Sequence, residues 1–251
     1  MAAAKLMTAQ QITAYPSPAH PSPGRQAAAW AVHAYTATGA VAAFLGTLAV
    51  FNARYRDAFL LMVAATIVDA TDGVFARAAN VKGLTPNFDG ARLDDIVDYL
   101  TFVFLPMLLV YHSGLVAGAP GLVTVSLVLL SSAYGFSSTD SKTDDHFFTG
   151  FPSYWNVVAL YLYAAQLPPE VNVGILLVLS ALVFVRLGYV YPTRTPVLRG
   201  PTMVLGLVWS VMIVAIILRL PDAPRVLLVG SLFFPVYYTV LSFVLHARRL
   251  R

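Results

Sequence analysis

The sequence predicts an all-α integral membrane protein with about eight transmembrane helices. Of its 251 residues, 58% are hydrophobic and only 11% are charged, whereas soluble domains carry about 25% charged residues. Apolar segments of roughly 20 residues, long enough to cross a bilayer as a helix, follow one another along the chain. Gly and Pro separate these segments, as expected for short connections between helices.

The predicted spans cover most of the chain between its two ends. In order, they are residues 28–51, 57–78, 89–112, 119–137, 151–167, 170–191, 201–219 and 223–246. Residues 1–26 are rich in Ala, Pro and Ser, a composition that predicts a disordered or extended tail. Residues 27–251 contain no internal repeat, so we expect a single transmembrane catalytic domain there.

The basic residues predict how the spans are oriented. With the N-terminus placed in the cytoplasm, twelve Lys and Arg residues fall in inner segments and four in outer ones. This excess favours both termini, and the acidic ends of spans two and three, on the cytoplasmic side. The net charge of +4 fits this orientation and contact with anionic lipid, and we expect no nucleic-acid partner.

The residue content excludes two kinds of site. The chain has no Cys, so disulfides and thiolate metal sites are excluded. Its five His residues are scattered, and none has the spacing of metal ligands. Any metal site must therefore be built from carboxylates.

Acidic residues concentrate in one stretch, because seven of the twelve lie within residues 57–98. Asp69 and Asp72 are three apart near the end of the second span, and Asp94 and Asp98 are four apart near the start of the third. Each pair therefore shares a helix face. The connecting segment contains Gly and Pro, so the chain can reverse there and bring four carboxylates together.

Such a cluster requires positive charge nearby. Carboxylates in an apolar chain are too costly to leave uncompensated, and Asp69 and Asp72 lie near a helix C-terminus, where negative charge is disfavoured. Arg77 can neutralise only one of them. Oxygen ligands are typical of Mg²⁺, Mn²⁺ or Ca²⁺ rather than zinc. Four carboxylates suit two divalent cations, an arrangement used for displacement at phosphorus.

Small and basic residues flank the cluster. Gly73 and Ala76 beside Asp72, and Gly90 on the facing helix, would let a ligand approach the backbone closely. Arg77 could bind a phosphate through two parallel hydrogen bonds. Helix packing explains each glycine equally well.

The other acidic residues of the stretch have a simpler interpretation. Asp57, Asp89 and Asp95 fit solvated helix ends. An ion or proton pathway is an alternative for the whole cluster, since carboxylates within membranes commonly mark one. The polar residues lie at one end, however, and no later span carries a buried acidic residue.

The pattern D-x-x-D-G-x-x-A-R…G-x-x-x-D-x-x-x-D is similar to the signature of the CDP-alcohol phosphotransferases. It stands here as Asp69, Asp72-Gly73, Ala76-Arg77, Gly90, Asp94 and Asp98. The motif covers thirty residues, and the family's multi-span architecture is compatible with the rest of the chain. The twelve residues between its halves are more than the family usually has. This longer gap, with eight spans and segment 146–156, resembles a bacterial branch that uses choline.

The resemblance implies transfer of the phosphatidyl group of CDP-diacylglycerol to choline, with release of CMP, in a bacterial inner membrane. Asp69 and Asp94 would bridge two ions, Mn²⁺ or Mg²⁺, with Asp72 completing one site and Asp98 the other. Asp98 would also be the catalytic general base. The small and basic motif positions would hold the nucleotide and diphosphate: Gly73, Ala76, Arg77 and Gly90. The family also implies a homodimer.

The acceptor must be recognised outside this motif. Choline is a quaternary ammonium without an N–H donor, so an aromatic cage is the expected recognition device. The candidates are Tyr154, Trp155, Asn156 and Tyr191, although Tyr and Trp gather at membrane interfaces in any case. Serine, inositol or glycerol phosphate stay open as acceptors, and a divalent-cation transporter with the same aspartates is a less favoured alternative.

Overall fold

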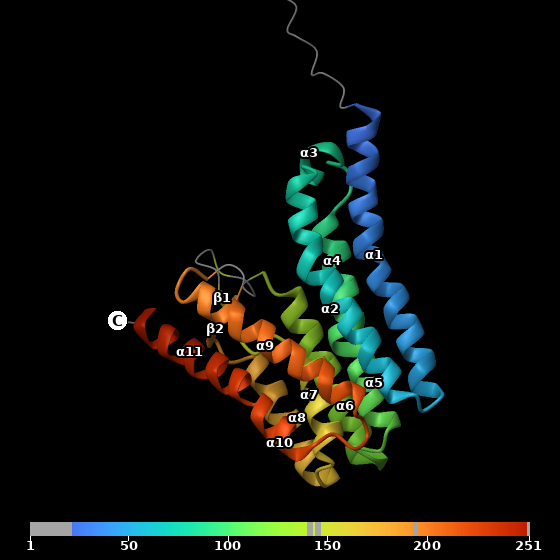
Figure 1. Cartoon of the computed structure of the whole chain (residues 1–251), viewed down its shortest axis with the longest axis vertical. Coiled ribbons are helices and arrows are strands. Elements are labelled where there is room, and N and C mark those ends of the chain that lie inside the picture. The colour runs from blue at the N-terminus through green and yellow to red at the C-terminus, as the bar shows by residue number, and fades with distance from the viewer. Residues whose placement is uncertain (1–21, 140–142, 144–146, 193–194, 250–251) are drawn as a thin grey trace, which may run out of the picture.

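The computed structural model describes residues 22–139, 143, 147–192 and 195–249. Its first part is a group of long helices that run side by side (Figure 1). These are α1 (Pro23–Phe51), α2 (Tyr55–Ala78) and a continuous helical run made of α4 (Gly90–Asp98), the π-helix η1 (Tyr99–Phe104) and α5 (Leu105–His112). The short helix α3 (Val81–Leu84) reverses the chain between α2 and α4.

The second part of the chain packs beside this group and ends in an oblique C-terminal helix (Figure 1). Its helices are α6 (Gly118–Ser137), α7 (Trp155–Ala165), α8 (Pro169–Val183), α9 (Arg199–Leu218), α10 (Arg225–Ser231) and α11 (Phe233–Arg249). Two short strands, β1 (Phe147–Thr149) and β2 (Gly188–Val190), pair in antiparallel fashion, with Phe148 opposite Tyr189.

The fold is that of an all-α membrane protein, as the sequence predicts. Five helical segments of the described chain are long and apolar enough to cross a bilayer: 23–51, 55–78, 118–137, 199–218 and 225–249. Apolar side chains cover the outside of these helices, as Leu207 at 68% and Val211 at 64% exposure illustrate. We assign this surface to contact with lipid.

Two predicted spans are longer than the helices that the structure shows. The span 151–167 contains α7 with 11 residues, and the span 170–191 contains α8 with 15. At 1.5 Å per residue these helices measure roughly 17 and 23 Å, against about 30 Å of hydrocarbon. Ser153 has a positive φ of 55° just before α7, and residues 188–190 leave the helical path to form β2.

The start of α1 also differs from the prediction. Pro23 occupies the first helical turn, where its missing N–H and fixed φ are tolerated. Residues 23–26, predicted as the end of the tail, are therefore helical. The rest of the predicted tail, residues 1–21, lies outside the described residues.

Small residues on α1 let the helical run 90–112 approach closely. Gly39 faces Val97, and Gly46 faces Leu105. The two glycines are seven residues apart, so they lie on the same face of α1. A side chain at either glycine would meet these neighbours, as in other membrane helices that pack through small residues. Helix α1 also packs against α2. The two helices that carry the aspartates, α2 and α4, therefore both pack against α1.

The π-helix η1 begins directly after Asp98. Here the Leu105 N–H donates to the carbonyl oxygen of Leu100, five residues earlier, in place of the usual four. Pro106 follows immediately and has no N–H to continue an α-helical ladder. The wider turn therefore accommodates the proline, and turns of this kind are frequent at functional sites.

Candidate metal and substrate site

Three carboxylates converge where α2 and α4 approach each other. Asp69 from α2 and Asp94 and Asp98 from α4 each offer an oxygen, and these oxygens lie within 4.8 Å of one another. All three side chains are partly buried. A set of carboxylate oxygens at this spacing is the donor chemistry of a hard divalent cation. The cluster can therefore hold a metal ion.

Asp72 lies one turn beyond Asp69 but has a different environment. Its exposure is 8%, and its Oδ2 accepts a 2.8 Å hydrogen bond from Thr36 Oγ1 of α1. The three-carboxylate group does not include it. Next to it, Thr71 and Tyr35 share a second 2.8 Å bond between the same two helices. The structure thus assigns α1 a part in orienting the motif, which the spacing of Asp residues does not reveal.

Thr36→Val is expected to destabilise the chain by about 1–3 kcal/mol, because it leaves a buried carboxylate without its donor while it conserves side-chain shape. Thermal unfolding in detergent with EDTA measures this loss. Thr38→Val is the matched control, since Thr38 Oγ1 is exposed and donates to the Tyr35 carbonyl of its own helix. Equal unfolding temperatures for the two variants would contradict the expectation.

Of the remaining motif positions, Gly73 lies next to Arg77, whereas Ala76 and Gly90 pack toward α1. Arg77 extends back over Gly73, so that a methyl group on Gly73 would lie 3.4 Å from its Nη1. Ala76 instead packs toward the small apolar cluster between α1 and α3. Gly90 faces His33, whose Cε1 would lie 2.8 Å from an added methyl group. For Ala76 and Gly90, the structure provides helix packing as a physical reason for a small residue.

Tyr154 lies just before α7 and is partly buried. It packs against the buried cluster that includes Tyr238 of α11, and the two rings meet edge to face with centroids 6.1 Å apart. The charges of Asp69 and Asp98 act on its hydroxyl. Tyr154 therefore lies between α11 and the acidic cluster.

Trp155 has a different position from its neighbour. Its side chain is fully buried, and its Nε1 donates a 2.7 Å hydrogen bond to Ser132 Oγ of α6. Its ring also packs against Phe151 with centroids 5.0 Å apart. This environment is that of a core residue and argues against direct contact between Trp155 and choline.

The other two acceptor candidates contact different parts of the fold. Asn156 Nδ2 donates a 3.3 Å bond to Thr66 Oγ1, three residues before Asp69 on α2. Tyr191 stacks on Phe148 with ring centroids 4.6 Å apart. The part of segment 146–156 that includes His146 lies outside the described residues.

Asp57 and Asp89, predicted to lie at solvated helix ends, are both found at helix starts. Asp57 lies in the first turn of α2, with its Oδ2 3.7 Å from Arg54 Nη1 on an exposed surface. Asp89 caps α4, where its Oδ1 accepts a 3.1 Å bond from the Arg92 N–H. Both arrangements are ordinary helix starts.

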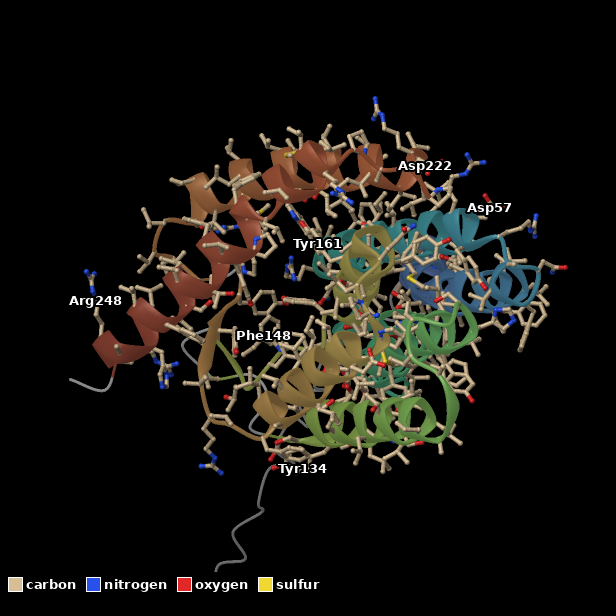
Figure 2. The ribbon with its side chains drawn as sticks, turned by 90° about the horizontal axis from the view of Figure 1, so that it is seen from below. Asp57, Tyr134, Phe148, Tyr161, Asp222 and Arg248 are labelled. Atoms are coloured by element: carbon tan, nitrogen blue, oxygen red, sulfur yellow. The ribbon has the colours of Figure 1, made fainter. Side chains whose placement is uncertain are left out.

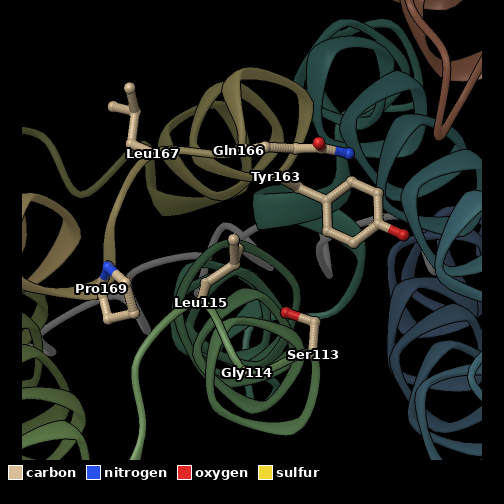
Figure 3. Close-up of a pocket in the computed structure, with 7 residues that line it drawn as sticks. All are labelled: Ser113, Gly114, Leu115, Tyr163, Gln166, Leu167 and Pro169. Atoms are coloured by element: carbon tan, nitrogen blue, oxygen red, sulfur yellow. The ribbon is translucent and has the colours of Figure 1, made fainter.

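Two recesses lie away from the carboxylates. One, of about 340 Å³, lies between the α5–α6 and α7–α8 connections (Figure 3) and is lined by Ser113, Gly114, Leu115, Tyr163, Gln166, Leu167 and Pro169. The other, of about 310 Å³, is lined by residues 53–57, Tyr163, Leu220 and Pro221. The start of α2 is at least 12 residues from Asp69, or roughly 18 Å along the helix. Ligand chemistry therefore favours the carboxylate cluster over either recess.

Comparison with known proteins identifies close relatives over most of the chain. No protein-family model matches it. A phosphatidylcholine synthase from Pseudomonas aeruginosa is 37% identical over 80% of this chain and 85% of its own. Phosphatidylcholine synthases from Rhizobium meliloti and Legionella bozemanae are 36% and 35% identical, over 86% and 77% of this chain and 90% and 93% of theirs.

Proposed function

The chain belongs to the phosphatidylcholine synthases, a bacterial branch of the CDP-alcohol phosphotransferases, and we propose that its aspartate cluster is their reaction centre. The family places CDP-diacylglycerol and choline as substrates in a multi-pass membrane enzyme. The observation that carries the proposal is the convergence of Asp69, Asp94 and Asp98, within 4.8 Å, from two helices of the signature motif.

The donor set fits two divalent cations, Mn²⁺ or Mg²⁺. Asp69, Asp72, Asp94 and Asp98 would hold them. Bound there, the cations would neutralise the diphosphate and make CMP a better leaving group. Thr36 supports the Asp72 assignment because its bond to Asp72 Oδ2 holds that carboxylate in one orientation.

Asp98 is proposed as the general base. It accepts the proton of the choline hydroxyl as the choline oxygen forms a bond to the phosphorus of the phosphatidyl group. The bond between that phosphorus and the oxygen bridging to CMP breaks, and CMP leaves with the electron pair. The position of Asp98 beside Asp69 and Asp94, with oxygens within 4.8 Å, supports this role.

The cytidine and diphosphate are proposed to lie toward the C-terminal end of α2. Arg77 is exposed and lies over Gly73 there, so its guanidinium is available for a phosphate. Ala76 and Gly90 would contribute by keeping the neighbouring helices close to α1. The acyl chains can stay in the bilayer, against the apolar exterior of the spans.

The orientation and assembly are proposals of the same kind. The excess of Lys and Arg on one side supports cytoplasmic termini and a cytoplasmic reaction centre. The resemblance to the wider family supports a homodimer. Choline arriving from the cytoplasm would then meet Asp98 directly, beside the aromatic side chains Tyr154 and Tyr191.

Purified protein with CDP-diacylglycerol and Mn²⁺ is expected to release CMP when choline is added. Serine, inositol and glycerol 3-phosphate, tested in parallel, are expected to give little release, and EDTA is expected to abolish the reaction. CMP release with serine but not choline would reject choline as the acceptor. No release with any acceptor would reject phosphotransferase activity and favour the alternative of a divalent-cation transporter.

A further inference from the structure

Three side chains of α11 form a ladder along strand β2. Tyr238, Ser242 and His246 are successive i, i+4 positions, so they share one face of the helix. Tyr238 Oη donates to the Val190 carbonyl at 2.9 Å, and Ser242 Oγ accepts from the Val190 N–H at 3.0 Å. His246 Nδ1 accepts from the Gly188 N–H at 3.1 Å. Side chains of α11 thereby form hydrogen bonds with the edge of β2 that does not pair with β1.

The same face of α11 fits closely against the strand pair. A methyl group on Gly188 would lie 2.8 Å from Arg249 Nη1, and the Arg249 guanidinium lies 4.5 Å from the centre of the Phe147 ring. Phe148 lies on the side of α11 that faces the other helices, while Arg248 points away (Figure 2). The strand pair and α11 therefore form one packed unit.

Tyr238 connects this unit to Tyr154. It is 9% exposed, and its hydroxyl donates to the Val190 carbonyl. Its ring meets the Tyr154 ring edge to face, with centroids 6.1 Å apart. Tyr238 thus contacts Tyr154 through its ring and, through its hydroxyl, the residue that precedes Tyr191.

We propose that Tyr238 is a positioning residue for choline, which holds the Tyr154 and Tyr191 rings in register beside the carboxylates. This role rests on the proposed function and on the assignment of those two rings to the acceptor. A quaternary ammonium makes no hydrogen bond, so its binding depends on aromatic faces held within about 6 Å. Small shifts of either ring then weaken choline binding more than binding of the anionic nucleotide, for which Arg77 and cations held by the aspartates are the proposed contacts.

Tyr238→Phe tests this role because it retains the ring and removes only the hydroxyl. Its KM for choline is expected to rise roughly five- to tenfold, as expected for the lost hydrogen bond to Val190, while kcat and the KM for CDP-diacylglycerol change by less than about twofold. Tyr237→Phe is the matched control. Its hydroxyl bonds Thr202 of α9 at 2.8 Å, so it removes a comparable bond from the same helix.

The outcomes separate this role from the proposed function. A wild-type chain that releases no CMP with choline overturns both. Choline-dependent release in the wild type, with equal choline KM values for the Tyr237→Phe and Tyr238→Phe variants, overturns the role of Tyr238 alone. A parallel rise in both substrate KM values, or a loss of kcat only, also overturns it.

A second variant decides the question if Tyr238→Phe does not fold in detergent. Ser242→Ala removes the acceptor of the Val190 N–H without altering Tyr154 directly. A selective rise in its KM for choline supports the positioning of Tyr191 by α11. An unchanged KM for choline in a folded Ser242→Ala variant overturns that positioning.

Discussion

Asp98→Asn is expected to lower choline-dependent CMP release by about a thousandfold, within the range of roughly 10²–10⁴ that general bases contribute. The amide retains the shape of the side chain and one oxygen, but it cannot accept the proton of the choline hydroxyl. Binding of CDP-diacylglycerol is expected to change little, since Arg77 of α2 is the proposed phosphate contact and the retained amide oxygen can still face a cation. Initial rates and equilibrium binding of the lipid nucleotide measure the two effects separately.

Asp95→Asn is the matched control for this substitution. Asp95 lies on the same helix and has the same charge, but it is outside the three-carboxylate group. Its variant is expected to turn over within a few-fold of wild type. Activity of the Asp98→Asn variant within tenfold of wild type would remove the base assignment, and Asp98→Glu, which restores a carboxylate, is expected to recover part of the rate.

Asp69→Asn is expected to weaken Mn²⁺ binding more than about a hundredfold, because changes even in residues behind the ligands cost 10–100-fold. Asp69 is the α2 member of a cluster whose other two members come from α4. Without it, α2 would contribute only Asp72, which lies outside the three-carboxylate group. The Mn²⁺ electron paramagnetic resonance signal, titrated into metal-free protein, reports binding without reference to turnover.

A folding measurement separates metal loss from misfolding in this variant. Three carboxylates within 4.8 Å repel one another when no cation is bound. In EDTA, Asp69→Asn is therefore expected to unfold at the same or a higher temperature than wild type. Asp57→Asn, which changes an exposed aspartate at the other end of α2, is expected to leave Mn²⁺ binding intact. Wild-type Mn²⁺ affinity in Asp69→Asn would contradict the assigned ligand set.

Local sequence patterns were sufficient for the class of fold and the family. Low charge and long apolar segments predict membrane helices, and five long apolar helices confirm that class. The motif from Asp69 to Asp98 predicts the family, which the related synthases confirm. Both predictions depend on short-range rules, namely the length of a spanning helix and the sharing of a face by residues three or four apart.

Element ends were less well predicted, because neighbours distant in the chain decide them. The span 170–191 is apolar throughout, yet its last residues pair with β1 and bond to α11. The apolar content of a segment does not distinguish a buried strand from the end of a helix. The turn of η1 after Asp98 likewise has only Pro106 as a local signal.

The sequence by itself predicted the chemistry of the proposed reaction centre, because residue type and helical spacing specify which carboxylates can share a face. Only the tertiary structure decided how the aspartates and the neighbouring aromatic residues are supported. Thr36 reaches Asp72 across 36 residues, and the Tyr238 hydroxyl reaches Val190 from the last helix. Threonine and tyrosine are common in such helices, and no local pattern distinguishes these two. Their roles arise from the packing of distant segments, which brings each hydroxyl to one particular partner.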